Sequence, residues 1–161
     1  MINLIRQNKN FLIKLKHSLL TGLILLFIHS TFARVVDNST DKGSLIVKIV
    51  GFENNKGECW FALDNSKEVY ESKDSVFVGK ILPIINNEVI VKIDSLSYGN
   101  YAIKVFHDEN SNQELDSNFL GIPTEDYGFS NNASSWFGPP SWEKSQFIVN
   151  KEELTIEISI E

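Results

Sequence analysis

Short runs of alternating apolar and polar residues, separated by turn-forming residues, occupy most of the chain after residue 43. Alternation with a period of two is the pattern of a β-strand that buries one face. The last run is the most regular, with an apolar residue at every second position from 154 to 160. The pattern predicts seven strands, at residues 44–52, 58–63, 76–85, 88–93, 101–107, 145–149 and 154–160.

Turn-forming residues between these runs predict two hairpins. Residues 54–57 stand between the first two runs, and Asn86-Asn87 stands between the third and fourth. Asparagine pairs tolerate the left-handed backbone of a tight hairpin turn. Residues 97–100 predict a third turn, and the polar segment 64–75 predicts a loop or one helical turn.

This spacing of short strands predicts an all-β fold, a seven-stranded antiparallel β-sandwich of immunoglobulin-like or prealbumin-like type. A small barrel is the alternative. Residues 108–144 show no sustained period and would form one long aromatic-rich loop. Loops of this length inside a compact domain are usually functional.

The amino terminus differs in character from the rest of the chain. Basic residues precede an apolar stretch at 19–28, which small residues follow up to Ala33. The stretch is shorter than the roughly 20 residues of a membrane-spanning helix. We therefore expect a signal peptide at 1–33, a linker at 34–42 and a single domain at 43–161. The mature protein would be exported, periplasmic or secreted, without a membrane span; an uncleaved anchor is the alternative.

Cleavage after residue 33 leaves 11 Lys and Arg against 21 Asp and Glu, a formal charge of −10 instead of the −6 of the whole chain. An acidic surface repels nucleic-acid phosphates and anionic lipids. We expect neither as a partner and expect cations instead.

Cysteine and histidine restrict the chemistry further. Cys59 is the only cysteine, which excludes an internal disulfide, and it alternates with Phe61 and Leu63 as a buried residue would. His107 is the only histidine after residue 33, so a multi-histidine zinc site is excluded and we interpret it as structural. The chain has no Gly-x-Ser-x-Gly motif. We expect a protein that is not an enzyme.

Oxygen-bearing side chains recur through residues 108–116 with the spacing of a calcium loop. Asp108, Asn110 and Asn112 occupy the first, third and fifth positions, and Asp116 the ninth. The backbone carbonyl of Glu114 would supply the seventh position. These residues predict a calcium site, because a set of oxygen donors on a short loop suits that ion.

The loop departs from the calcium pattern at two positions. Gln113 stands where the turn glycine is expected, and Phe119 stands where the closing glutamate is expected. Glu125 and Asp126 are the nearest acidic residues that could replace the missing ligand. The alternative is a polar loop whose side chains bond to their own backbone.

Aromatic residues form the second unusual feature. Tyr127, Trp136, Phe137 and Trp142 lie among glycines, prolines and asparagines. Exposed rings would bind a protein or glycan partner. The alternative, which we slightly favour, is that the rings anchor the loop over one end of the sandwich.

These motifs together resemble the bacterial family called domain of unknown function 2141, over roughly residues 43–160. The resemblance is carried by Gly99–Ile103, His107–Asn110, Asn112, Leu115–Asp116, Gly121–Pro123, Tyr127–Asn132 and Phe137–Pro140. It implies a β-sandwich and export, but no reaction and no catalytic residue. The family has Asn-Gly in the acidic loop and Leu-Pro before the Gly-x-Tyr turn, where this chain has Gln113 and Ser97.

Three functional hypotheses follow. The first is an exported, non-enzymatic module that binds calcium and an unknown protein or glycan. The second is a carbohydrate-active hydrolase that uses carboxylates near the same loop. The third is a purely structural protein whose acidic loop binds nothing.

Overall fold

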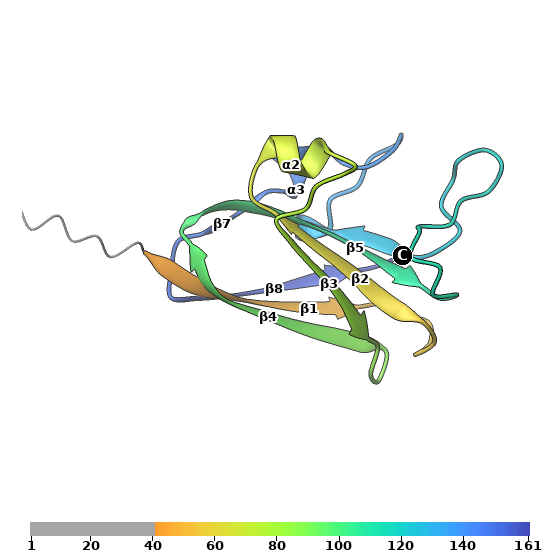
Figure 1. Ribbon diagram of the computed structural model, residues 1–161, viewed down its shortest axis with the longest axis horizontal. Coiled ribbons are helices and arrows are strands. Elements are labelled where there is room, and N and C mark those ends of the chain that lie inside the picture. Colours follow the sequence, from red (N-terminus) through yellow and green to blue (C-terminus); the bar gives the residue numbers. More distant parts are fainter. Residues whose placement is uncertain (1–40) are drawn as a thin grey trace, which may run out of the picture. The chain divides into compact units, whose positions relative to one another are not determined.

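The computed structural model describes residues 41–161, so the predicted signal peptide and nearly all of the predicted linker lie outside the described residues. Within this part of the chain, eight strands form two packed sheets (Figure 1). The strands are β1 (Lys42–Val50), β2 (Glu58–Asp64), β3 (Val78–Pro83), β4 (Glu88–Ser97), β5 (Gly99–Asp108), β6 (Tyr127–Phe129), β7 (Phe147–Val149) and β8 (Glu153–Ser159). The short helices are α2 (Lys67–Glu71), η1 (Ser130–Asn132) and α3 (Trp142–Ser145).

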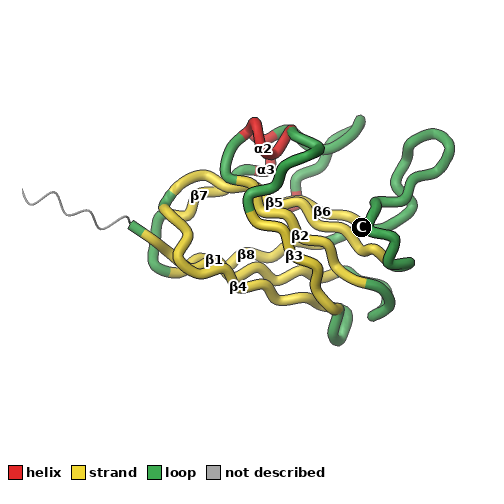
Figure 2. The backbone as a smooth tube through the Cα atoms, in the orientation of Figure 1, coloured by secondary structure: helices red, strands yellow, loops and turns green. Residues whose placement is uncertain are grey.

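The two layers have different strand orders (Figure 2). The first sheet is β4-β1-β8, and the second is β3-β2-β5-β6, with β7 paired to the start of β5. The chain changes layer between β4 and β5, where Ser97 ends one strand and Gly99 begins the next. The all-β sandwich is therefore confirmed, whereas its immunoglobulin-like or prealbumin-like type stays a prediction.

Neither predicted hairpin forms a pair of adjacent strands. The turn at Asn86-Asn87 does form, with φ values of 56° and 59°, and backbone bonds between Ile85 and Glu88 close it. Beyond the turn, however, β3 pairs with β2 and β4 pairs with β1. β1 and β2 likewise lie in opposite sheets. The predictions failed because the apolar faces of consecutive strands meet across the core instead of lying side by side in one sheet.

Three further details correct the predicted layout. β8 runs parallel to β1, so the sandwich is not fully antiparallel. Residues 108–144 are not one loop, because they include β6 and η1, and α3 begins at Trp142. The strand predicted from residue 145 begins at Phe147, since Ser145 still belongs to α3. A three-residue strand such as β6 is too short to produce a visible alternation.

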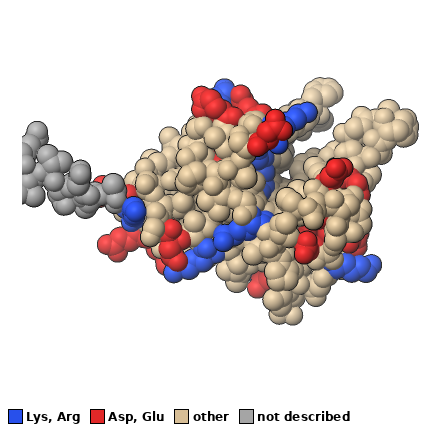
Figure 3. Space-filling model, in the orientation of Figure 1, with Lys and Arg blue, Asp and Glu red and all other residues tan. Residues whose placement is uncertain are grey.

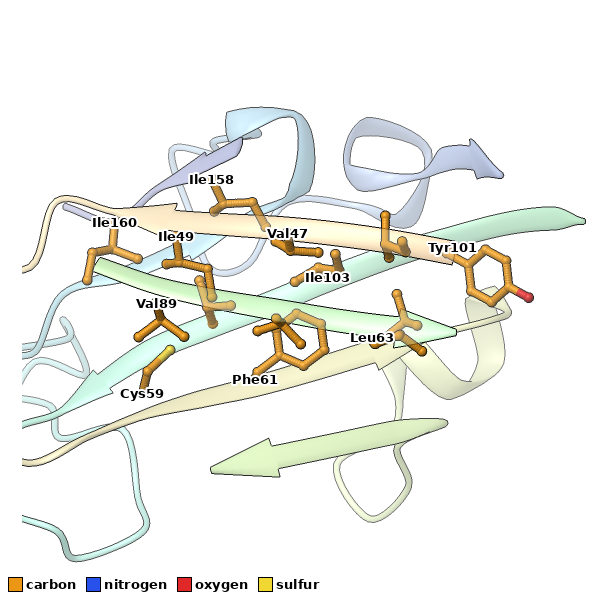
Figure 4. Packing of buried hydrophobic residues seen from close by; sticks show 14 of the residues in the cluster. Val47, Ile49, Cys59, Phe61, Leu63, Val89, Tyr101, Ile103, Ile158 and Ile160 are labelled. Carbon is orange, nitrogen blue, oxygen red and sulfur yellow. The ribbon is translucent and has the colours of Figure 1, made fainter. Parts of the chain in front are cut away.

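Apolar residues at alternate positions of both sheets fill the space between the layers (Figure 4). Each fully buried Leu, Ile or Phe side chain stabilises the fold by about 1.5–3 kcal/mol. The core residues of β1, β2, β4 and β5 are Leu45, Val47, Ile49, Cys59, Phe61, Leu63, Val89, Val91, Ile93, Leu96, Tyr101, Ile103 and Val105. Burial along these strands follows the two-residue period that predicted them.

No helix within residues 41–161 is long and apolar enough to cross a membrane.

We expect the thiol of Cys59 to resist aromatic disulfide reagents at pH 8 until the protein is unfolded. Its side chain is fully buried, and burial raises the pKa of Cys59 from 9.0 to about 12. Because the folded-state pKa is the higher one, this group favours folding below pH 9, and that contribution is lost as the pH rises towards 12. Alkaline unfolding curves of Cys59→Val should lack this loss. Rapid labelling of the native protein would contradict the prediction.

Candidate functional site

The carboxylate of Asp108, at the end of β5, is fully buried and accepts three N–H groups. Its Oδ1 accepts the backbone N–H of Asn112 at 3.0 Å, and its Oδ2 accepts that of Gln113 at 2.8 Å. Oδ2 also accepts the indole N–H of Trp60, on neighbouring β2, at 3.1 Å. A buried carboxylate is tolerated only with such donors. Asp108 thus fixes the start of the acidic loop, residues 108–116.

The acidic loop is tightly coiled by hydrogen bonds from its side chains to its own backbone. Gln113 adopts a φ of 71°, the left-handed conformation for which glycine is favoured at the sixth position. The side-chain oxygen of Asn110 accepts the N–H of Asn112 at 2.9 Å, and that of Asn112 accepts the N–H of Glu114 at 2.8 Å. The missing glycine therefore does not prevent this backbone.

Two of the predicted ligand side chains, those of Asn110 and Asn112, lie against the carboxylate of Asp116. Its Oδ2 accepts the amide N–H of Asn110 at 2.6 Å, and its Oδ1 accepts that of Asn112 at 3.1 Å. Glu114 takes part through its backbone, and its side chain is exposed. Within residues 41–161 no group of three or more His, Cys, Asp and Glu side chains is placed to hold a metal ion. A cation here would depend on Asn oxygens as well as on carboxylates.

Glu125 lies beside the acidic loop, as the sequence suggested for a replacement ligand. Its two oxygens accept the backbone N–H groups of Glu109 and Asp116, each at 3.0 Å. The backbone oxygen of Asp116 accepts the N–H of Thr124 at 2.8 Å. The acidic loop and the segment that follows it are therefore closed at one common base.

His107 has the structural role predicted for it. Its ring is buried, its Nε2 lies 2.8 Å from the carbonyl oxygen of Lys56, and it packs edge-on against Phe52. These contacts hold the loop between β1 and β2 against the end of β5.

The outer face of the second sheet carries an apolar row that the sequence analysis did not identify as a site. Cross-strand pairing aligns Ile81, Trp60, Phe106 and Tyr127 on that face. The rings of Trp60 and Phe106 stack with their centroids 5.7 Å apart and their planes at 14°. The missed signal was that β2 and β5 carry apolar residues on both faces, which is unusual for a strand with one solvated side.

A cleft of about 740 Å³ lies over this row. Ala62 and Gly79 of the sheet line it, as do Val76, Leu115 and Pro139 from outside the sheet. Few polar groups face this cleft, whose volume falls in the range of small-molecule sites.

An ion pair and two short helices bound the region beside the cleft. Lys104, on β5, extends its Nζ to 2.9 Å from Oδ2 of fully buried Asp64, and neither carboxylate oxygen has a hydrogen bond of good geometry. The same Nζ donates to the carbonyl oxygen of Tyr70 at 2.9 Å. Tyr70 and Trp142, from α2 and α3, cover the sheet near Ala102.

The four aromatic residues predicted to bind a partner do not form one surface. Trp142 is buried against Tyr70, so its prediction as a binding residue is wrong and it anchors α3. Tyr127 lines the cleft, whereas Trp136 and Phe137 are 98% and 94% exposed. The chain thus uses one ring as an anchor and exposes two others.

Comparison with known proteins gives one match. A family model described as "Uncharacterized protein conserved in bacteria (DUF2141)" covers residues 47–157, which confirms the resemblance seen in the motifs. No curated protein and no solved structure matches the chain.

We expect Trp60→Phe to lower the free energy of unfolding by about 1–3 kcal/mol, because it leaves Oδ2 of the buried Asp108 carboxylate with one donor fewer. Chemical denaturation followed by circular dichroism measures the change. Trp136→Phe is the matched control and should have no effect, since Trp136 is 98% exposed. Equal effects of both substitutions would show that the indole N–H of Trp60 does not contribute.

Proposed function

The chain belongs to the bacterial family of domain of unknown function 2141, and from that premise we propose that it is an exported, non-enzymatic module that binds calcium in its acidic loop and a partner in its apolar cleft. The observation that carries the proposal is the coil of the acidic loop around Asp108, with Asn110, Asn112 and Asp116 turned towards one another.

The hydrogen bonds of Asp116 support a cation at this position. Two amide N–H groups, from Asn110 and Asn112, lie against its carboxylate. The hydrogens of these amides place partial positive charge where a bound cation would place full positive charge. The oxygens of the two amides accept the backbone N–H groups of Asn112 and Glu114, and each oxygen keeps a second lone pair that an ion could use.

The donors favour calcium with modest affinity. Asp116 would supply charge, Asn110 and Asn112 neutral oxygens, and the carbonyl of Glu114 a further ligand, while Asp108, whose two oxygens already accept N–H groups, would hold the loop in its coil. Phe119 cannot act as the closing ligand, and both Glu125 oxygens already accept backbone N–H groups. Water would complete the shell, which suits a dissociation constant of about 10⁻⁴–10⁻³ M.

The ion would stabilise the cleft as well as the acidic loop. Asp108 links the acidic loop to the cleft, because its carboxylate accepts the backbone N–H of Gln113 in the loop and the indole N–H of Trp60 in the cleft. Leu115, from the loop itself, forms a wall of the cleft. Ordering the acidic loop therefore preorganises the floor and one wall of the partner site.

The hydrogen bonds that the carboxylates near the acidic loop accept favour a binding module over a hydrolase. A glycosidase needs one carboxyl group that donates a proton and a second that acts as base or nucleophile. Asp108 and Glu125 are each held by backbone N–H groups, which gives them a structural role. The apolar cleft favours a protein partner with apolar side chains over a glycan, because sugar hydroxyls need polar groups that this cleft largely lacks.

The calcium site is tested by thermal unfolding of residues 34–161 in chelator, in 5 mM calcium and in 5 mM magnesium. A ligand that binds only the folded state stabilises it by mass action, here by about 1–2 kcal/mol. We expect calcium to raise the melting temperature by several degrees and magnesium to raise it less.

Two substitutions make this test specific. Asp116→Ala should abolish the calcium response, because it removes a proposed ligand at an accessible position. Glu114→Gln is the control and should preserve the response, since only its backbone is a proposed ligand. Absence of any shift at 5 mM calcium would leave the acidic loop as a self-bonded turn and refute the calcium site.

The cleft is tested by selection of peptides from a random display library against the domain. We expect enriched peptides to be rich in apolar residues and to lose binding to Ala62→Phe, whose ring would fill the floor of the cleft. Ile90→Phe, on the outer face of the other sheet, should bind the same peptides as the unchanged domain. Peptides that ignore the Ala62 substitution would place the partner site elsewhere.

A further inference from the structure

Two loops beside the cleft end in almost fully exposed apolar side chains. The first arm, residues 117–124, presents Phe119 and Leu120, which are 95% and 68% exposed. The second arm, residues 131–141, presents Trp136 and Phe137. Both arms project from the same side of the sandwich in Figure 1. Exposed apolar groups concentrated in this way mark an interaction surface.

The two arms contain no Asp, Glu, Lys, Arg or His, although the described domain is rich in charge. Residues 41–161 carry 20 Asp and Glu and 10 Lys. Figure 3 shows the outer parts of both projections without charged residues, while charged side chains lie at their bases. Burying a charge in an apolar medium is costly, so this distribution matches a partner of low polarity.

Part of the backbone of the first arm is hydrogen-bonded within the arm. Ser117 and Pro123 form a bridge, and the side chain of Asn118 accepts the N–H groups of Leu120 and Ile122 at 2.9 and 3.1 Å. Such a tip exposes apolar side chains without exposing all of its hydrogen-bonding groups. Insertion of the tip into an apolar medium is therefore less costly.

The second arm is fixed at its base to the sandwich. The side chain of Asn131 donates to the carbonyl oxygens of Lys144 and Gln146 at 3.1 and 2.8 Å. The hydroxyl of Tyr70 donates to the carbonyl oxygen of Pro140 at 3.0 Å. The tip between these anchors holds Trp136 and Phe137 away from the body of the protein.

We propose that the two arms dock the domain on the interface of an electrically neutral lipid bilayer. Protruding tips suit a deformable partner better than a rigid one, because each tip can sink independently between lipids. Tryptophan favours the boundary between headgroups and acyl chains, and Phe119 and Leu120 supply apolar area to bury there. This docking is distinct from calcium binding and from the cleft.

The charges at the bases of the arms set the lipid preference. Asp116, Glu125 and Asp126 flank the first arm, and the domain as a whole is acidic. Anionic lipids would repel this surface at low ionic strength, whereas zwitterionic lipids would not. Neutral vesicles are therefore the expected partner.

Co-sedimentation of residues 34–161 with phosphatidylcholine vesicles, in chelator and in calcium, tests the proposal. We expect binding in both conditions and weaker binding to phosphatidylglycerol vesicles in chelator. The double substitutions Trp136→Ser with Phe137→Ser, and Phe119→Ser with Leu120→Ser, should each weaken binding about tenfold or more. Ile90→Ser, which removes another exposed apolar side chain, is the matched control and should bind as the unchanged domain does.

Two outcomes would overturn the proposal. The first is no binding to phosphatidylcholine vesicles, or binding that the arm substitutions leave unchanged. The second is a dimer in solution that the arm substitutions dissociate, because the tips would then contact a second copy of the chain. Loss of calcium binding in the thermal assay would not affect the docking, so the two proposals fail separately.

Discussion

The functional end of the molecule depends on one buried carboxylate. Asp108 ends β5 with no exposed surface, and its charge must be met by N–H donors. The donors come from the acidic loop and from the indole of Trp60 on the adjacent strand. A single group therefore sets the coil of the loop, the position of the central ring in the cleft floor and the point from which the first arm leaves the sheet.

The outer faces of the two sheets differ in polarity. The outer face of the first sheet carries exposed ion pairs, among them Lys48 with Glu88 at 3.4 Å and Lys92 with Asp94 at 3.1 Å. Exposed pairs of this kind add little stability, but they keep that face hydrated. The second sheet is instead covered by α2 and α3 near Ala102 and left as an apolar cleft towards Phe106. Leu115 of the acidic loop and Pro139 of the second arm line this cleft.

Calcium binding, partner binding and bilayer docking would use neighbouring but separate groups. The proposed ion ligands are polar residues of 108–116, the cleft is formed by sheet residues together with Val76, Leu115 and Pro139, and the exposed rings of the arms lie outside it. The acidic loop and the first arm share a base formed by Glu125, Thr124 and Asp116, whereas the second arm is anchored separately through Asn131 and Tyr70.

Local pattern determined much of this protein. Alternation predicted most of the strands, and the spacing of oxygen side chains located the acidic loop. The burial of Cys59 followed from its alternation with Phe61 and Leu63, and the structural role of His107 followed from the absence of a second histidine after residue 33. Tertiary structure alone decided which strands pair. Two consecutive strands can bury their apolar faces equally well as neighbours in one sheet or as members of two sheets that face each other across the core. It also decided that Trp142 is an anchor while Trp136 is exposed, and that Trp60 and Phe106 stack in one row. Those outcomes depend on which strands lie next to each other, and a periodicity along the chain carries no information about neighbours distant in sequence.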